Sequence, residues 1–163
     1  MKQKRWMWMS VCSVMALAAA SLAWADDDEH EEGSRRGRTR VVMPPAYQQE
    51  CAACHMAYPP GMLPASSWRA VMTTLPKHYG SDASLDAATV NKLSAWLVAN
   101  ASPAVARPEQ DRITRTGWFL HEHDEISASV WKRASIKSAA NCMACHAGAD
   151  KGDFNEHRVR IPR

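Results

Sequence analysis

The sequence has little net charge and only one long apolar run. Its 20 basic and 17 acidic residues give a formal charge of +3, and three of the basic residues lie within residues 1–25. The remaining chain is balanced, with 17 residues of each sign. This balance gives no indication of a nucleic-acid partner, which calls for a basic surface. Because no second apolar run approaches the roughly 20 residues of a membrane span, we expect the chain after residue 25 to be soluble.

The one apolar run lies near the N-terminus, over residues 6–22, after a basic start. An A-x-A cleavage pattern follows at residues 23–25, which completes the layout of a secretory signal peptide. A membrane anchor is the alternative, but the run is short for a span and ends at small residues. We therefore expect residues 1–25, with Cys12, to be removed on export to the periplasm.

Cysteine is scarce in the remaining chain and is confined to two short motifs. Both have the form C-x-x-C-H, which is the pattern of haem c attachment. Two thiols at this spacing reach the two vinyl groups of one porphyrin, and the next histidine points at the iron from the same side. The sequence thus predicts two covalently bound haem c groups. The attachment residues and proximal ligands are Cys51, Cys54 and His55 for haem one, and Cys142, Cys145 and His146 for haem two.

Three other uses of four cysteines fit the sequence less well. An exported chain with an even number of cysteines is a candidate disulfide scaffold, but that use leaves the histidine after each pair unexplained. A thioredoxin-like redox pair needs a βαβ context, which this pattern lacks. A zinc site built from two C-x-x-C pairs normally has a shorter separation and no matched histidines. The haem interpretation uses all four cysteines and both histidines.

Composition also predicts the domain organisation. Residues 26–43 are expected to be a disordered tail, because an acidic block and then a basic block fill residues 26–40. We predict a first haem domain over residues 44–100, a proline-containing linker over 101–116 and a second haem module over 117–163. Each module is too small to form a core easily, so covalent haem is expected to serve as core.

The apolar spacing predicts a mainly α fold. In the first module, a short helix is expected to carry residues 51–55. A second helix is expected from about Trp68, capped by Ser66 or Ser67, with Gly80 suited to the end of that segment. A third is expected after Asp86 as N-cap. The apolar stripes of the last two helices predict core and haem-pocket wall: Trp68, Val71, Met72 and Leu75, then Val90, Leu93, Trp96 and Leu97.

Fewer elements are predicted in the second module. A helix is expected over about residues 127–134, and Ser138 is a candidate cap for a helix that leads into Cys142. The tail over residues 154–162 is expected to fold back over the second haem. This module is therefore predicted to be the more irregular of the two.

The sixth ligand of each iron decides the function, and the candidates are histidine and methionine. In the first module, His78 is the only histidine besides His55, and Met62 and Met72 compete with it. Met72 fits the apolar stripe as a core residue. We favour His78, because imidazole is a strong ligand and methionine commonly fills cores.

The second module offers three histidines as distal ligand. His121 and His123 lie two residues apart, which puts them on opposite faces of an extended segment, so only one of them can bind the iron. Spacing alone does not choose between them. His157 lies in a charged tail and is the weakest candidate.

Several motifs outside the cysteine pairs carry a family resemblance over nearly all of residues 44–163. They are Tyr58-Pro59-Pro60-Gly61-Met62-Leu63-Pro64, Trp68, His78-Tyr79-Gly80, Ala83-Ser84-Leu85-Asp86, Ile113-Thr114-Arg115-Thr116, Trp118-Phe119, His123-Asp124-Glu125-Ile126, Trp131, Ala140-Asn141-Cys142 to His146, Gly152, Phe154, Glu156 and Ile161-Pro162. In combination these motifs are specific. The chain resembles the small bacterial dihaem cytochromes c, of the type found with an oxygen-binding monohaem cytochrome c and a membrane cytochrome b.

The resemblance implies a fold and a ligand set. Both haems are expected to be bis-histidine, with His78 on haem one and His123 on haem two. His121 ranks second, because the family often has a different residue there. Met62 stands where an aliphatic residue is usual, which keeps methionine ligation of haem one open. The first module is expected to have a class I cytochrome c-like fold with a shortened distal side, and the second to be a small irregular wrap.

Two strong axial ligands would leave no open position on either iron, so we expect electron transfer rather than catalysis. The expected protein is a monomeric periplasmic carrier with two low-potential haems, since bis-histidine ligation lacks the methionine that raises the potential. It would pass electrons between a membrane donor and a soluble haem protein, and the resemblance implies the membrane cytochrome b and the oxygen-binding cytochrome as partners. The alternative is a haem enzyme, a peroxidase or small-molecule oxidoreductase, with one open iron.

Overall fold

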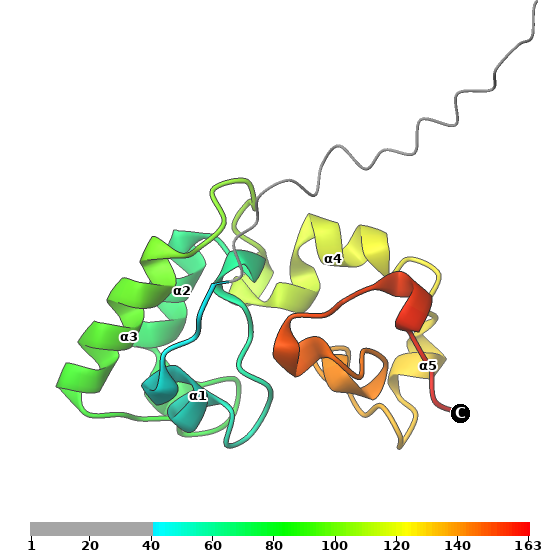
Figure 1. The fold of residues 1–163 in the computed structure, drawn as a ribbon, viewed down its shortest axis with the longest axis horizontal. Coiled ribbons are helices and arrows are strands. Elements are labelled where there is room, and N and C mark those ends of the chain that lie inside the picture. Colours follow the sequence, from blue (N-terminus) through cyan, green and yellow to red (C-terminus); the bar gives the residue numbers. More distant parts are fainter. Residues whose placement is uncertain (1–40) are drawn as a thin grey trace, which may run out of the picture. The chain divides into compact units, whose positions relative to one another are not determined.

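The computed structural model describes residues 41–163, and Figure 1 labels its α-helices. The expected signal peptide with Cys12, and residues 26–40 of the expected tail, lie outside the described residues. The described part of the chain has five α-helices and seven short 3-10 helices. Within residues 41–163 the only β pairing is an isolated bridge between His78 and Ser81. The expected mainly α fold is confirmed.

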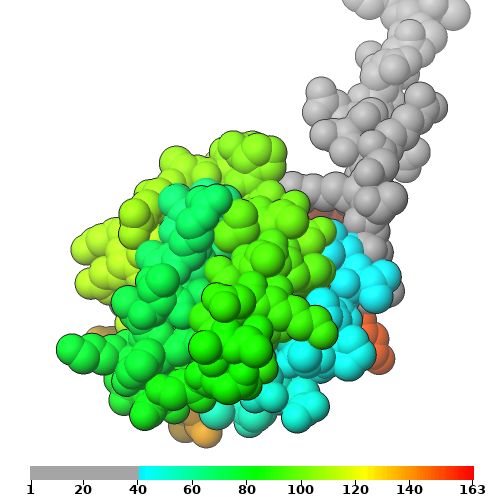
Figure 2. Space-filling view, turned by 90° about the vertical axis from the view of Figure 1, so that its left-hand side faces the viewer, coloured from blue at the N-terminus to red at the C-terminus, as the bar shows by residue number. Residues whose placement is uncertain are grey.

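Three α-helices build the N-terminal half: α1 (Pro45–Cys51), α2 (Ala65–Thr73) and α3 (Ala87–Ala99). The 3-10 helices η2 (Pro60–Met62) and η3 (Leu75–Lys77) precede and follow α2. Helices α2 and α3 pack against each other, as Figures 1 and 2 show. Apolar side chains from all three helices and from the loops between them form one core: Tyr47, Ala57, Leu63, Trp68, Met72, Leu75, Leu93 and Leu97.

Helix α3 begins as the sequence predicts. The Asp86 carboxylate accepts a hydrogen bond from the Thr89 N–H at 3.0 Å, which satisfies one of the N–H groups that a helix start leaves free. Leu93 and Leu97 of the predicted stripe are each 1 % exposed, while Val90 and Trp96 lie half-buried at its edge. The cap and the buried stripe together fix α3 against α2.

Helix α2 begins earlier than predicted, at Ala65, and neither Ser66 nor Ser67 caps it. Pro64 occupies the N-cap position with an extended backbone, so it sets where the helix starts. Ser67 is 0 % exposed and lies inside the helix, on the face that packs inward. The predicted stripe itself is confirmed, since Trp68, Val71, Met72 and Leu75 are all buried.

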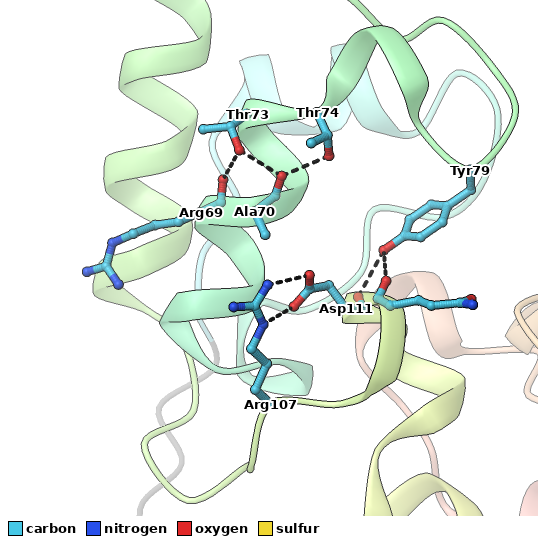
Figure 3. Close-up of polar contacts among 8 residues, drawn as sticks. Arg69, Ala70, Thr73, Thr74, Tyr79, Arg107 and Asp111 are labelled. Atoms are coloured by element: carbon cyan, nitrogen blue, oxygen red, sulfur yellow. Dashed lines mark hydrogen bonds and ion pairs between the residues drawn. The ribbon is translucent and has the colours of Figure 1, made fainter.

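Residues 101–116, expected as a linker, fold onto the N-terminal half. They contain the 3-10 helices η4 (Glu109–Asp111) and η5 (Ile113–Arg115), and η4 packs against α2. The Ser102 N–H donates to the Leu63 carbonyl at 3.0 Å. The Tyr79 hydroxyl reaches the carbonyl oxygens of Gln110 and Asp111 (Figure 3). These bonds hold the segment against the helices that precede it.

The C-terminal half consists of short elements. They are α4 (Gly117–Glu122), α5 (Ala128–Trp131) and the 3-10 helices η6 (Cys142–Ala144), η7 (Ala149–Lys151) and η8 (Glu156–Arg158). Helix α5 covers only part of the predicted helix over residues 127–134. The predicted helix from Ser138 into Cys142 is wrong, because Lys137 has a left-handed φ of 69° and the Ser138 hydroxyl accepts the Ala140 N–H in a turn.

Helix α4 replaces the extended segment that the sequence analysis assumes around His121 and His123. The Thr116 hydroxyl caps it by accepting a hydrogen bond from the Phe119 N–H at 3.3 Å. The Phe119 side chain is 6 % exposed, which holds the helix against its surroundings. His121 therefore lies within a helix, and His123 is its C-cap residue.

The C-terminal tail folds back onto the second cysteine motif. The Arg160 N–H donates to the Cys145 carbonyl at 3.0 Å, and the Arg133 side chain donates to the Pro162 carbonyl at 2.8 Å. Figure 1 shows the end of the tail, in red, beside α5. Among the helices of residues 41–163, none combines the length and apolar character needed to cross a membrane.

Candidate haem-binding sites

The first C-x-x-C-H motif begins at the end of α1. The predicted short helix is present as α1, but it ends at Cys51 and the chain continues through turns, so it does not extend to Cys54 and His55 as expected. The chain bends here because Met56 and Ala57 are buried and have to enter the interior. The His55 Nδ1 lies 2.7 Å from the Met56 carbonyl oxygen. A carbonyl only accepts, so Nδ1 carries the hydrogen and Nε2 keeps the lone pair that a metal requires.

His78 faces His55 from the end of η3, where the chain reverses. The reversal uses the bridge to Ser81 and left-handed φ values of 50° at Tyr79 and 103° at Gly80. A φ of 103° is readily adopted only by glycine, which explains Gly80 at this point. The ring centroids of His78 and His55 are 6.1 Å apart, with 29° between the ring planes. The structure thus brings together His55 of the first motif and His78, the distal candidate that the sequence favours.

The competing methionines lie in other settings. Met72 is 5 % exposed and belongs to the apolar core, where it packs as the sequence analysis expects. Met62 lies half-buried in the 3-10 helix η2. Neither location favours a methionine over His78 as the residue that faces His55.

The second motif forms a tight turn that starts with η6. The His146 N–H donates to the Cys142 carbonyl at 2.8 Å and closes the turn. The His146 ring faces His123, with centroids 6.2 Å apart and planes inclined by 74°. The His123 Nδ1 lies 2.9 Å from the Phe119 carbonyl, so Nε2 of His123 is again the nitrogen left for a metal. The Phe119 ring stacks on His123 with a centroid distance of 4.1 Å.

The two other histidines of this half lie in different surroundings. His121 is exposed on α4. The His157 side chain is 85 % exposed, in the short helix η8 beside Glu156. The structure therefore pairs His146 with His123, and helix α4 presents His121 to solvent.

Burial adjusts the acid–base properties of both pairs. The pKa of His78 is lowered by burial first, and then by the nearby His55 and the positive charge of Arg112. The pKa of His146 is lowered by burial and by His123, against a smaller raising effect of Asp153. Both shifts favour the neutral imidazole, which is the form that binds a metal.

None of the four cysteines of the described residues is joined to another in a disulfide, so all four are available for thioether bonds to haem. Burial, with the charge of Glu50, raises the pKa of the Cys51 thiol to about 11, and burial also raises the pKa of Cys142 and Cys145. Within residues 41–163, no three His, Cys, Asp or Glu side chains converge as a metal-binding group. The arrangement of two thiols and two opposed imidazoles suits a porphyrin iron, whose other four ligands come from the macrocycle.

Tyr58 connects the two motifs, a role that the sequence pattern does not predict. Its ring stacks on His55 with a centroid distance of 4.8 Å, and its hydroxyl donates to the Ala140 carbonyl at 2.7 Å, two residues before Cys142. The sequence marks Tyr58 as an aromatic residue three positions after His55 and as the start of the motif that runs to Pro64, but neither signal points to Ala140. A cavity of about 490 Å³ lies beside this link and is lined from both motifs, by Cys54, His55 and Met143 among others.

The comparison with protein families decides the identity. The family model for dihaem cytochrome c matches residues 47–154. The chain belongs to the dihaem cytochrome c family. As a dihaem cytochrome c it carries two covalently attached haem c groups, as the sequence predicts, and it is an electron-transfer haem protein. Cys51 and Cys54, within C-x-x-C-H, are consistent with this attachment.

Solved structures of other dihaem cytochromes c support the same assignment. This dihaem cytochrome c is 37% identical to one from Shewanella baltica, with a TM-score of 0.66, covering 75% of this chain and 95% of the other. It is 46% identical to one purified from Rhodobacter sphaeroides, with a TM-score of 0.62 and coverage of 70% and 99%. A second Rhodobacter sphaeroides structure is 42% identical, with a TM-score of 0.63 and coverage of 71% and 100%. No curated protein sequence matches the chain.

Proposed function

We propose that this dihaem cytochrome c is an electron carrier in which both irons are closed by two histidines. Haem one would be held by Cys51 and Cys54 and bound by His55 and His78. Haem two would be held by Cys142 and Cys145 and bound by His146 and His123. The observation that carries this proposal is the spacing of the two imidazole pairs, 6.1 Å and 6.2 Å between ring centroids.

The spacing supports the proposal because it matches what one metal ion between two imidazoles requires. A metal–imidazole bond is about 2.0–2.1 Å long and a ring nitrogen lies about 1.2 Å from the ring centre, so opposed rings have centres about 6.4–6.6 Å apart. Both pairs lie within a few tenths of an ångström of that range. For His55 and His123 the Nδ1 hydrogen bonds to main-chain carbonyls also leave Nε2 free.

The ligand set determines what such a site does. A haem with two strong axial ligands exchanges single electrons without binding substrate, and two histidines give a lower potential than histidine with methionine. The protein's part is to keep His78 and His123 in position and to keep exogenous ligands away from the irons. His123 is held by the hydrogen bond of its Nδ1 to the Phe119 carbonyl, and His78 follows η3 where the chain reverses.

The location and partners of the carrier are part of the same proposal. The N-terminal signal-peptide pattern supports export to the periplasm, where we propose that the carrier acts as a monomer. The resemblance noted in the sequence supports a membrane cytochrome b as donor and an oxygen-binding monohaem cytochrome c as acceptor. Mass spectrometry of the periplasmic fraction tests the first point, because a mature chain starting at Asp26 is expected and a retained N-terminus would contradict it.

Carbon monoxide distinguishes this function from the enzyme alternative. The reduced holoprotein at neutral pH is mixed with carbon monoxide and followed by absorption. We expect no prompt binding, together with low-spin spectra in both oxidation states, because neither iron has a free position. Prompt binding by the wild-type protein would contradict the carrier proposal and favour a peroxidase or oxidoreductase with one open iron.

Three substitutions test the assigned ligands. His78→Ala is expected to convert haem one to high spin, and His123→Ala to convert haem two. His121→Ala is the matched control, because His121 lies two residues from His123 but is exposed on α4. If His121→Ala gave the high-spin signal and His123→Ala did not, the distal ligand of haem two would be reassigned.

A further inference from the structure

Three of the four paired histidines have an additional feature that holds the imidazole in place. This feature is a haem-attachment cysteine next to the histidine in the chain, a hydrogen bond from the ring, or both. His55 is tied into the first motif beside Cys54, and its Nδ1 bonds to the Met56 carbonyl. His146 follows Cys145 directly in the second motif. His123 has no neighbouring cysteine, but its Nδ1 bonds to the Phe119 carbonyl at 2.9 Å and its ring stacks on Phe119. Hydrogen bonds of this kind orient a ligating imidazole and raise its basicity.

His78 has neither kind of attachment. It lies far from both cysteine motifs in the chain, and within residues 41–163 no acceptor is hydrogen-bonded to its ring. The structure instead fixes the next residue. The Tyr79 hydroxyl lies 3.1 Å from the Gln110 carbonyl oxygen and 2.9 Å from that of Asp111 (Figure 3). One hydroxyl hydrogen is shared between these two acceptors.

The acceptor segment is itself held firmly. The Arg107 guanidinium makes two hydrogen bonds of 2.8 Å to the Asp111 carboxylate, a bidentate ion pair that closes the segment over residues 107–111. The Arg112 guanidinium lies over the Tyr79 ring, 4.2 Å from its centroid. We refer to Tyr79 with residues 107–112 as the Tyr79 clamp.

The backbone at the clamp adopts conformations that need such contacts. Tyr79, Gln110 and Asp111 have φ values of 50°, 57° and 54°. Residues with a Cβ rarely adopt this left-handed region, and they persist there when the surrounding structure holds them. A small cavity of about 60 Å³ is lined by His78, Tyr79, Gln110 and Asp111 together, so the clamp and His78 border the same space.

We propose that the Tyr79 clamp is the positioning device that keeps His78 on the iron of haem one. Tyr79 is a positioning residue in this proposal, since it acts through His78. The inference rests on His78 as the distal ligand, as proposed above. It adds that haem one loses its distal ligand before haem two when the surrounding structure is weakened. The reason is that His78, alone of the four histidines, has neither a neighbouring cysteine nor a hydrogen bond from its ring.

The test compares Tyr79→Phe and Arg107→Gln with the wild-type holoprotein. Phenylalanine keeps the ring under Arg112 and removes only the hydroxyl, and glutamine removes the ion pair with Asp111. Each is expected to speed carbon monoxide binding to reduced haem one by roughly 5-fold, the factor that one hydrogen bond of ordinary strength gives. In the double variant the rate of carbon monoxide binding is expected to rise by less than the product of the two single-variant factors, because both substitutions release the same segment. Amide exchange at Asp111 and Arg112 is expected to rise in parallel.

Tyr47→Phe is the matched control. The Tyr47 hydroxyl also donates to a main-chain carbonyl, that of Tyr58, but it lies in the buried core. The spectra of His78→Ala and His123→Ala identify which haem has opened. The proposal is overturned if Tyr79→Phe leaves the rate unchanged, if Tyr47→Phe raises it equally, or if the carbon monoxide enters haem two. Prompt binding by the wild-type protein would instead contradict the bis-histidine function on which the proposal rests.

Discussion

The link between the two haem-binding motifs gives the sharpest prediction about stability. Tyr58 is the residue that joins them: its ring stacks on His55, and its hydroxyl donates to the Ala140 carbonyl at 2.7 Å. Tyr58→Phe removes the hydroxyl and keeps the ring, so the stacking on His55 is retained. The substitution therefore isolates one hydrogen bond between residues 82 positions apart in the chain.

The expected loss of stability follows from the surroundings of that bond. A protein hydrogen bond contributes about 0.5–1.5 kcal/mol net, and the upper part of that range applies where the abandoned partner is buried. Ala140 is exposed, so water replaces the lost donor and a value of about 0.5–1 kcal/mol is expected for Tyr58→Phe. For a domain of this size that corresponds to a fall in Tm of about 2–5 °C.

The same residue predicts a dependence on pH. Burial, with a smaller contribution from Cys142, raises the pKa of Tyr58 from 10.0 to about 12. After haem attachment only burial still raises the pKa of Tyr58, because Cys142 is then part of a thioether and carries no charge. A raised pKa in the folded state means that the contribution of Tyr58 is fully present below pH 10 and is lost as the pH rises through 12. The two-unit difference corresponds to about 2.7 kcal/mol, but screening at this half-buried site reduces the expected effect to about 1 kcal/mol.

The assay is reversible denaturation of the holoprotein, followed by circular dichroism at pH values between 8 and about 12. Wild type is expected to exceed Tyr58→Phe by a constant margin up to about pH 10, and this margin is expected to disappear by about pH 12. Tyr58→Leu, which also removes the stacked ring, is expected to be less stable than Tyr58→Phe at every pH. A margin that does not change with pH would refute the assignment of a shielded, donating hydroxyl to Tyr58.

Three further predictions concern the elements that position the sites. Asp86→Ala is expected to destabilise the protein by about 1 kcal/mol through loss of the α3 cap, whereas Asp86→Asn keeps an acceptor for Thr89 and is expected to be nearly neutral in urea denaturation. Leu93→Ala, at a side chain 1 % exposed, is expected to cost about 2–5 kcal/mol in the same measurement, and a smaller loss would mean that α3 is not central to the core. Phe119→Ala removes the ring stacked on His123 and is expected to increase the high-spin fraction of haem two while leaving haem one unchanged; equal changes at both haems would contradict a local effect.

Local patterns in the sequence were sufficient for part of the fold. The Asp86 cap and the stripe of Leu93 and Leu97 depend on residues within one or two helical turns, and the structure agrees with both. The starts of α2 and α4 differ from the prediction, although their signals are also local. Pro64 starts α2 through its extended backbone, where Ser66 and Ser67 were the predicted caps, and Thr116 caps α4, where an extended segment around His121 was expected.

The haem groups themselves were determined by the sequence, because covalent attachment needs two thiols and a histidine within five consecutive residues. Which other histidine faces His55 and which faces His146 depends on distant segments, and the tertiary structure decides it. His78 faces His55 only because the chain reverses at Tyr79 and Gly80, and His123 faces His146 only because α4 ends where it does. The Tyr58 link and the Tyr79 clamp join residues 82 and about 31 positions apart, a separation at which no local pattern records the contact.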